Sequence, residues 1–302
     1  MRNYDRACKL LIPEKEFTDL LKMDYLNKVD LDVCNYICKQ SLNVSFNPYN
    51  IMVSKEITLD ELIARTLGEV KVFGDDIMLY VYALITAIPI NMQNEDILEY
   101  SCNVTYSLQK ENNEIISNSG HISNFCIPKY LNEYSVFGFG HENMHALKET
   151  YYEEYKKAFT LGETIPLFFE LLMFNPSDKL RYDLIRDRIF NLNINKKEYL
   201  IADKLLNKNG SYYSDVDDFY KSRSIYEYVR SKCGVYLNSF YYAIILYSMY
   251  KENPRKILNY VISVLNQQIT TFDMLSYLDI YGDIKGERFE KELVKIKRLI
   301  KK

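Results

Sequence analysis

The sequence is poor in residues that interrupt regular structure. It has 10 glycines and 7 prolines among 302 residues, and no low-complexity linker or internal repeat divides it. Because glycine and proline weaken or end helices and strands, this scarcity predicts long, continuous elements. With 48% apolar residues, the chain can bury a large core without disulfides or a structural metal to hold it.

Long apolar runs are also missing. The longest, Met78–Ile90 and Phe240–Tyr250, are shorter than the ~20 residues that a membrane-spanning helix needs. The first residues, MRNYDRACKLLIPEKEF, lack the apolar run of a signal peptide. The net charge of −3 gives no general attraction to nucleic acid or to an anionic membrane. We therefore expect a cytoplasmic protein with neither nucleic acid nor a membrane as a partner.

The six cysteines form no CxxC pair and no dense framework, so we expect reduced thiols. Cys34 and Cys38 lie four residues apart in an expected helix and could meet a metal ion. The sequence favours the alternative, in which both are small buried side chains.

The expected fold is mostly α with a small antiparallel β-sheet. Thr58 and Glu61 form a capping box that opens a helix through about Val70, and a second, apolar helix follows over 75–91. The alternation of SCNVTYSL (101–108) predicts a strand, 110–114 is turn-like, and 115–127 predicts one or two more strands. The second half is rich in helix, with expected segments 133–149, 151–174, 178–192, 196–207, 215–230, 236–251, 254–267, 271–280 and 286–301. We divide the chain into a helical N-terminal region, 1–95, and a region 96–302 that carries the chemistry, together one continuous globular unit.

Two of the three histidines in the chain stand in HENMH, 141–145. In a helix, His141 and His145 lie one turn apart on one face, and both rings can reach a single Zn²⁺. Glu142, beside them, can then act as general base toward the attacking water. The alternative is a pair of histidines that only pack in the helix or cap it.

A zinc site of this kind needs a third protein ligand. His121 is a candidate, but it precedes the motif and falls among the expected strands. Glu163 is the better one, because a carboxylate between apolar residues at the start of a buried helix needs a compensating charge. Glu170, two turns later on the same face, could support a ligand from behind.

With these residues, the sequence resembles the oligoendopeptidase F and thimet oligopeptidase family of gluzincin zinc metallopeptidases. The family carries HExxH on one helix and, on the next, a glutamate ligand followed by a second glutamate seven positions on. The resemblance implies a gluzincin-like catalytic domain with zinc bound by His141, His145 and Glu163. It also implies that a tyrosine of YLNSFYY (236–242) assists the transition state. Tyr241 is the closest match, and Tyr236 and Tyr242 are further candidates.

The expected function is zinc-dependent hydrolysis of peptide bonds in a peptide or protein substrate. Glu142 would take a proton from water and pass it to the leaving amine, and a tyrosine hydroxyl would stabilise the oxyanion. Two alternatives remain open. One is a zinc peptidase of another gluzincin family with a different third ligand, and the other is a non-catalytic helical binding or regulatory protein that retains a metal site.

Overall fold

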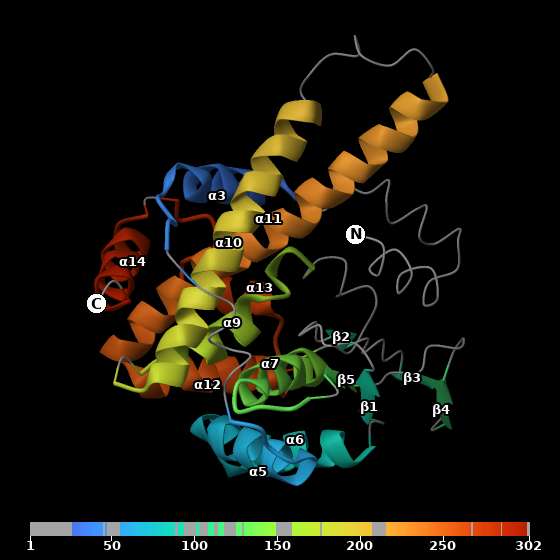
Figure 1. Cartoon of the computed structure of the whole chain (residues 1–302), viewed down its shortest axis with the longest axis vertical. Coiled ribbons are helices and arrows are strands. Elements are labelled where there is room, and N and C mark those ends of the chain that lie inside the picture. Colours follow the sequence, from blue (N-terminus) through green and yellow to red (C-terminus); the bar gives the residue numbers. More distant parts are fainter. Residues whose placement is uncertain are drawn as a thin grey trace.

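The computed structural model describes residues 26–44, 46, 55–87, 90–93, 101–102, 108–111, 114–117, 125–128, 130–148, 159–175, 177–206, 216–266, 268–284 and 286–300. These residues are mostly helical, which confirms the main part of the expected fold class (Figure 1). The helices are α3 (Lys28–Lys39), α5 (Leu59–Val70), α6 (Asp75–Ala87), α7 (Ser135–Lys148), α9 (Thr164–Leu172), α10 (Lys179–Leu206), α11 (Val216–Glu252), α12 (Pro254–Leu265), α13 (Thr271–Tyr277) and α14 (Glu287–Leu299), with short 3-10 turns η1 (Lys71–Phe73) and η2 (Phe159–Leu161).

Short strands lie between α6 and α7 in the chain. They are β1 (Ile90–Gln93), β2 (Ser101–Cys102), β3 (Leu108–Glu111), β4 (Glu114–Ser117) and β5 (Phe125–Pro128). β5 is the middle strand of a three-stranded sheet, parallel to β1, with Ile90 opposite Phe125, and antiparallel to β2. β3 and β4 form a separate antiparallel pair. This mixed, very short pairing does not confirm the expected small antiparallel sheet, and the expected strand residues 103–107 and 118–124 lie outside the described residues.

Two pairs of expected helices are each a single helix. The merged segments are 178–192 with 196–207, in α10, and 215–230 with 236–251, in α11. Asn193 and Asn195, at the first junction, are only modestly unfavourable inside a helix. At the second junction, Gly234 lies inside the helix, and its missing side chain leaves room for Leu26: a Cβ there would lie 2.5 Å from the Leu26 side chain. Neither of these long helices, nor any other in the described ranges, is both long and apolar enough to cross a membrane.

The capping box of Thr58 and Glu61 is confirmed at the start of α5. Two other helix boundaries differ from expectation. The helix expected over 75–91 ends at Ala87, because Pro89 follows in the sequence and the residue before a proline disfavours helix. The helix expected over 151–174 is described from 159, and its α-helical part begins only at Thr164, since Pro166 lacks an N–H and fits only a first turn.

α11 is the central helix of the described residues. α3, α9, α10, α12 and α14 pack against it, and its residues 237–246 are all buried. α7 packs against α9 and α5, with α6 and β5 also in contact with it (Figure 1). The segment with the two histidines is therefore an interior helix between the N-terminal helices and α9. The expected division at 95 stays a prediction.

Candidate metal centre

The two histidines of HENMH lie on one face of α7. Nε2 of His141 and Nε2 of His145 are 3.2 Å apart, and the two rings meet edge to face. Phe139 and Met144 of the same helix are fully buried, so α7 is anchored in the core. The spacing of one helical turn thus brings two imidazole nitrogens to one point beside the helix.

Glu163 brings a carboxylate to the same point. It directly precedes Thr164, the first residue of α9, but its side chain makes no capping hydrogen bond to that helix. Instead, its Oε2 lies 3.1 Å from Nε2 of His141 and 3.4 Å from Nε2 of His145. Only 13% of the Glu163 side chain is exposed, so solvent screens these contacts little.

The three ligand atoms form a triangle with sides of 3.1, 3.2 and 3.4 Å. Tetrahedral zinc holds nitrogen and oxygen ligands at about 2.0–2.1 Å, which separates neighbouring ligand atoms by about 3.3 Å. One ion can therefore lie at bonding distance from all three atoms without rearrangement of the helices. The group of His141, His145 and Glu163 could hold a metal ion, and no other such group of three was found in the part of the chain that the structure describes.

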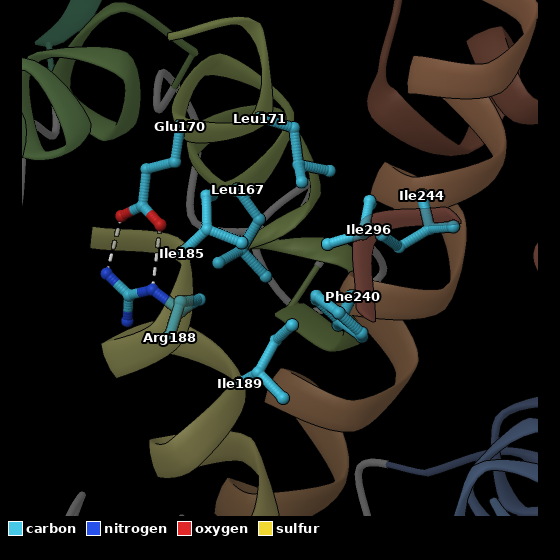
Figure 2. A pocket seen from close by; sticks show the side chains of 9 residues that line it. All are labelled: Leu167, Glu170, Leu171, Ile185, Arg188, Ile189, Phe240, Ile244 and Ile296. Atoms are coloured by element: carbon cyan, nitrogen blue, oxygen red, sulfur yellow. Dashed lines mark hydrogen bonds and ion pairs between the residues drawn. The ribbon is translucent and has the colours of Figure 1, made fainter. Parts of the chain in front are cut away.

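Glu170 holds His141 from the other side of the ring. Its Oε1 lies 2.7 Å from Nδ1 of His141, the nitrogen that does not face the triangle. A metal-binding histidine is commonly fixed in this way, because the bond at one ring nitrogen orients the other. Arg188 of α10 donates to both Glu170 oxygens, from Nε at 2.7 Å and from Nη2 at 2.5 Å (Figure 2). Glu170 thus lies between His141 and Arg188.

α7 and α9 approach each other closely beside the cluster. Gly140 precedes His141, and Phe169 precedes Glu170. A Cβ atom at position 140 would lie 2.5 Å from Cε1 of Phe169, closer than real Cβ contacts allow. Glycine at this position is therefore what lets α7 and α9 meet at their observed separation.

Buried polar groups fix the turn that precedes Glu163. The carbonyl of Thr160 accepts hydrogen bonds from Nδ2 of Asn238 at 3.0 Å and from Oγ of Ser239 at 3.3 Å. Asn238 also donates to Oδ1 of Asp30 in α3, at 3.1 Å. All three partners of this turn, Asp30, Asn238 and Ser239, are fully buried. These bonds hold η2 against α11 and so position Glu163.

The charges of the cluster act on one another. Burial lowers the pKa of His141, but Glu170 and Glu163 outweigh burial and raise that pKa to about 10. Burial raises the pKa of Glu163, but His145 and His141 outweigh it and lower the pKa well below its ordinary value. At neutral pH both ring nitrogens of His141 therefore carry a proton. A metal ion must displace the proton at Nε2, because a metal binds the neutral ring.

Glu142 experiences the same charges. Burial raises its pKa to about 8; Glu163 and Glu170 add to this effect, and His141 and Arg188 oppose it. A carboxyl group whose pKa lies near neutral pH can both accept a proton and return it. At neutral pH Glu142 is thus mostly protonated, and a cation held by the neighbouring histidines and Glu163 would lower its pKa toward the range of a general base.

The tyrosines expected at the site lie elsewhere. The Tyr241 hydroxyl donates to the carbonyl of Asp283 at 2.6 Å, and the Tyr242 hydroxyl accepts from the backbone N–H of Gly282 at 3.2 Å. Both side chains are fully buried, so their hydroxyls serve the turn at 282–283. The expectation for Tyr241 and Tyr242 is corrected accordingly: the structure does not bring them to the metal cluster. Tyr236 is half-buried on the same helix, and its role stays a prediction.

The remaining metal candidates are His121 and the cysteines Cys34 and Cys38. His121 lies outside the described residues. Cys34 is fully buried, and its thiol donates to the carbonyl of Gly234 at 3.3 Å. Cys38 is half-buried in the same helix, α3. Within the described ranges, neither cysteine belongs to a group of three side chains that could share an ion.

Arg188 and Gly140 were not predicted from the sequence. Arg188 stands three residues after Ile185 and four before Leu192, both buried, so its place in the apolar stripe of α10 is the one signal of burial. Gly140 stands inside a helix directly before His141, a position where a glycine indicates close approach of another element.

Comparison with known proteins adds no relative to this description. Neither the protein-family models, nor the curated proteins, nor the solved structures that were searched include a match to this chain. The resemblance to the oligoendopeptidases thus stays a prediction that depends on His141, Glu142, His145, Glu163 and Glu170.

Proposed function

We propose that this chain is a zinc-dependent peptidase that hydrolyses peptide bonds in a peptide or protein substrate. The observation that carries the proposal is the triangle formed by Nε2 of His141, Nε2 of His145 and Oε2 of Glu163. Its sides match the ligand separations of tetrahedral zinc, and three protein ligands leave a fourth position for chemistry. HExxH adds a carboxylate, Glu142, next to the first ligand.

In this proposal each residue of the site has its own role. His141, His145 and Glu163 hold the ion, and Glu170 orients the His141 ring. A bound zinc ion would polarise the peptide carbonyl and lower the pKa of a water molecule toward 7. Glu142 accepts the proton of that water as its oxygen bonds to the carbonyl carbon, and returns the proton to the amine as the C–N bond breaks.

Glu142→Gln tests the proposal, because it removes the base and leaves every proposed ligand in place. Wild type and variant are each incubated with a tryptic digest of unfolded casein, and new cleavages are followed by mass spectrometry. Glu287→Gln, at an exposed position of α14, is the matched control. We expect equal zinc content in all three proteins and a loss of about 10²- to 10⁴-fold in cleavage rate for Glu142→Gln alone.

Two results would contradict the proposal. Equal cleavage by wild type and Glu142→Gln would exclude the assigned base. A zinc-loaded wild type that cleaves nothing in the digest would favour the alternative, a non-catalytic binding or regulatory protein that retains a metal site.

A further inference from the structure

The geometry points to Arg188 as a positioning residue of the metal centre: it fixes the Glu170 carboxylate, which in turn fixes the ring of His141. This role rests on the proposed function, since it has meaning only if His141 binds a metal. Arg188 lies on α10, whereas His141 lies on α7 and Glu170 on α9. The chain of contacts therefore joins a third helix to the two that carry the ligands.

The Glu170 carboxylate is bound at both oxygens. Oε1 faces Nδ1 of His141 at 2.7 Å and Nη2 of Arg188 at 2.5 Å, and Oε2 faces Nε of Arg188 at 2.7 Å. Arg188 thus uses the planar, two-pronged geometry that only a guanidinium offers to a carboxylate. With two parallel bonds the carboxylate cannot rotate, so the direction of Oε1 toward His141 is fixed.

Burial makes this contact necessary. Glu170 is 1% exposed, in an α9 whose residues 164–171 are all buried. Ile185, Ile189 and Phe240 line a small cavity beside the ion pair, with room for about one water molecule (Figure 2). Little solvent therefore reaches Glu170, and without Arg188 its buried carboxylate would lose the charged donor that binds both of its oxygens.

Asp187, the residue before Arg188 in α10, connects the same turn of this helix to the start of α7. Oδ2 of Asp187 accepts a hydrogen bond from the Tyr134 hydroxyl at 3.1 Å, just before the first residue of α7. Oδ1 of Asp187 accepts from Nδ2 of Asn191 at 3.1 Å. Asp187 and Arg188 together hold the start of α7 and the last turn of α9, so α10 fixes how these two helices face each other.

Arg188→Met and Arg188→Lys test this role, with Arg181→Met as the matched control. Arg181 lies on the same helix and also binds a glutamate of another helix, with Nη2 2.5 Å from Oε1 of Glu69. Its exposure is similar, 29% against 25% for Arg188, but none of its partners, which are Glu69, Asp178 and the Met173 carbonyl, belongs to the metal cluster. The measurements are the zinc Kd of the full chain by competition with a chelator, circular dichroism for folding, and the visible spectrum of bound Co²⁺.

We expect Arg188→Met to weaken zinc binding by about 10- to 100-fold, the range found for residues that orient a metal ligand. Arg188→Lys should lie between wild type and Arg188→Met, because an ammonium offers a point charge in place of two parallel bonds. Arg181→Met should keep the zinc Kd within about threefold. The Co²⁺ spectrum should change in the Arg188 variants alone, which a general loss of stability would not produce.

The inference is overturned if Arg188→Met binds zinc as tightly as wild type, or if Arg188→Met and Arg181→Met weaken binding equally. If Arg188→Met does not fold, Arg188→Lys decides: an unchanged Kd and Co²⁺ spectrum would overturn the role. A wild type that binds no zinc would instead remove the proposed function itself. Failure of the positioning role and failure of the metal site are therefore separate results.

Discussion

Replacing Gly140 by alanine should destabilise the protein and weaken metal binding together. The new Cβ would lie 2.5 Å from Cε1 and 2.9 Å from Cζ of Phe169. The ring cannot easily give way, because Phe169 is fully buried and packs on Phe73 with centroids 5.9 Å apart. To reach an ordinary contact of 3.4 Å, ring or helix must move by about 0.9 Å.

The size of this movement determines both the loss of stability and the loss of zinc affinity. Overpacking a buried site costs about 1–3 kcal/mol, while alanine in place of glycine inside a helix gains about 0.5–1 kcal/mol. We expect a net loss of about 1–2 kcal/mol in the free energy of unfolding. Zinc sites tolerate ligand shifts of about 0.2 Å, well below 0.9 Å. Separation of α7 from α9 should therefore also weaken zinc binding, by tenfold or more.

Gly68→Ala is the matched control, because Gly68 lies in α5 and a Cβ added there would meet no atom within 4 Å. It should gain about 0.5–1 kcal/mol and leave zinc binding unchanged. Urea denaturation of the metal-free proteins gives the stabilities, and competition with a chelator gives the zinc Kd. A Gly140→Ala protein that gains stability as Gly68→Ala does, or that loses stability yet binds zinc as wild type does, would show that the contact with Phe169 does not set the helix separation.

Two further predictions concern protonation and the tyrosines. The raised pKa of His141, about 10, means that zinc must displace a proton at pH 7. The affinity of the protein for zinc should therefore fall by about tenfold for each unit by which the pH falls. Calorimetry in buffers of different ionisation enthalpy should show about one proton released per zinc bound. A Kd that does not change between pH 6 and 8 would contradict this. Tyr241→Phe removes the hydroxyl that donates to the Asp283 carbonyl and accepts from the backbone N–H of Gly286. The substitution should cost about 1–2 kcal/mol of unfolding free energy and keep kcat/KM within about twofold, whereas a 100-fold loss would restore the tyrosine to the catalytic site.

The sequence predicts the helical elements well where their own residues decide them. The Thr58 capping box begins α5 as expected, because the two side chains and backbone groups involved lie within four residues. The joins inside α10 and α11 were not predicted. The join in α11 contains Gly234, whose missing side chain leaves the space that Leu26 fills. Local propensity cannot show such a contact between distant residues.

The candidate site divides in the same way. His141 and His145 lie on one face because of their spacing alone, and Glu163 could be selected because a carboxylate among apolar residues needs a partner. Arg188 could not be assigned to Glu170, because nothing in the sequence states which face of α10 meets α9. The expectation for Tyr241 failed for the same reason. The sequence does not show which way the Tyr241 side chain points, because that depends on the turn at 282–283, whose Asp283 carbonyl accepts its hydrogen bond.

Zinc content decides whether the three proposed ligands hold an ion at all. Wild type and His145→Ala are purified without added zinc, equilibrated with a small excess, passed through a desalting column, and measured by elemental analysis. We expect close to one zinc per wild-type chain and almost none in His145→Ala, with both proteins folded. A folded wild type with less than about half an equivalent, or a variant that retains its zinc, would contradict a metal ion held by His141, His145 and Glu163.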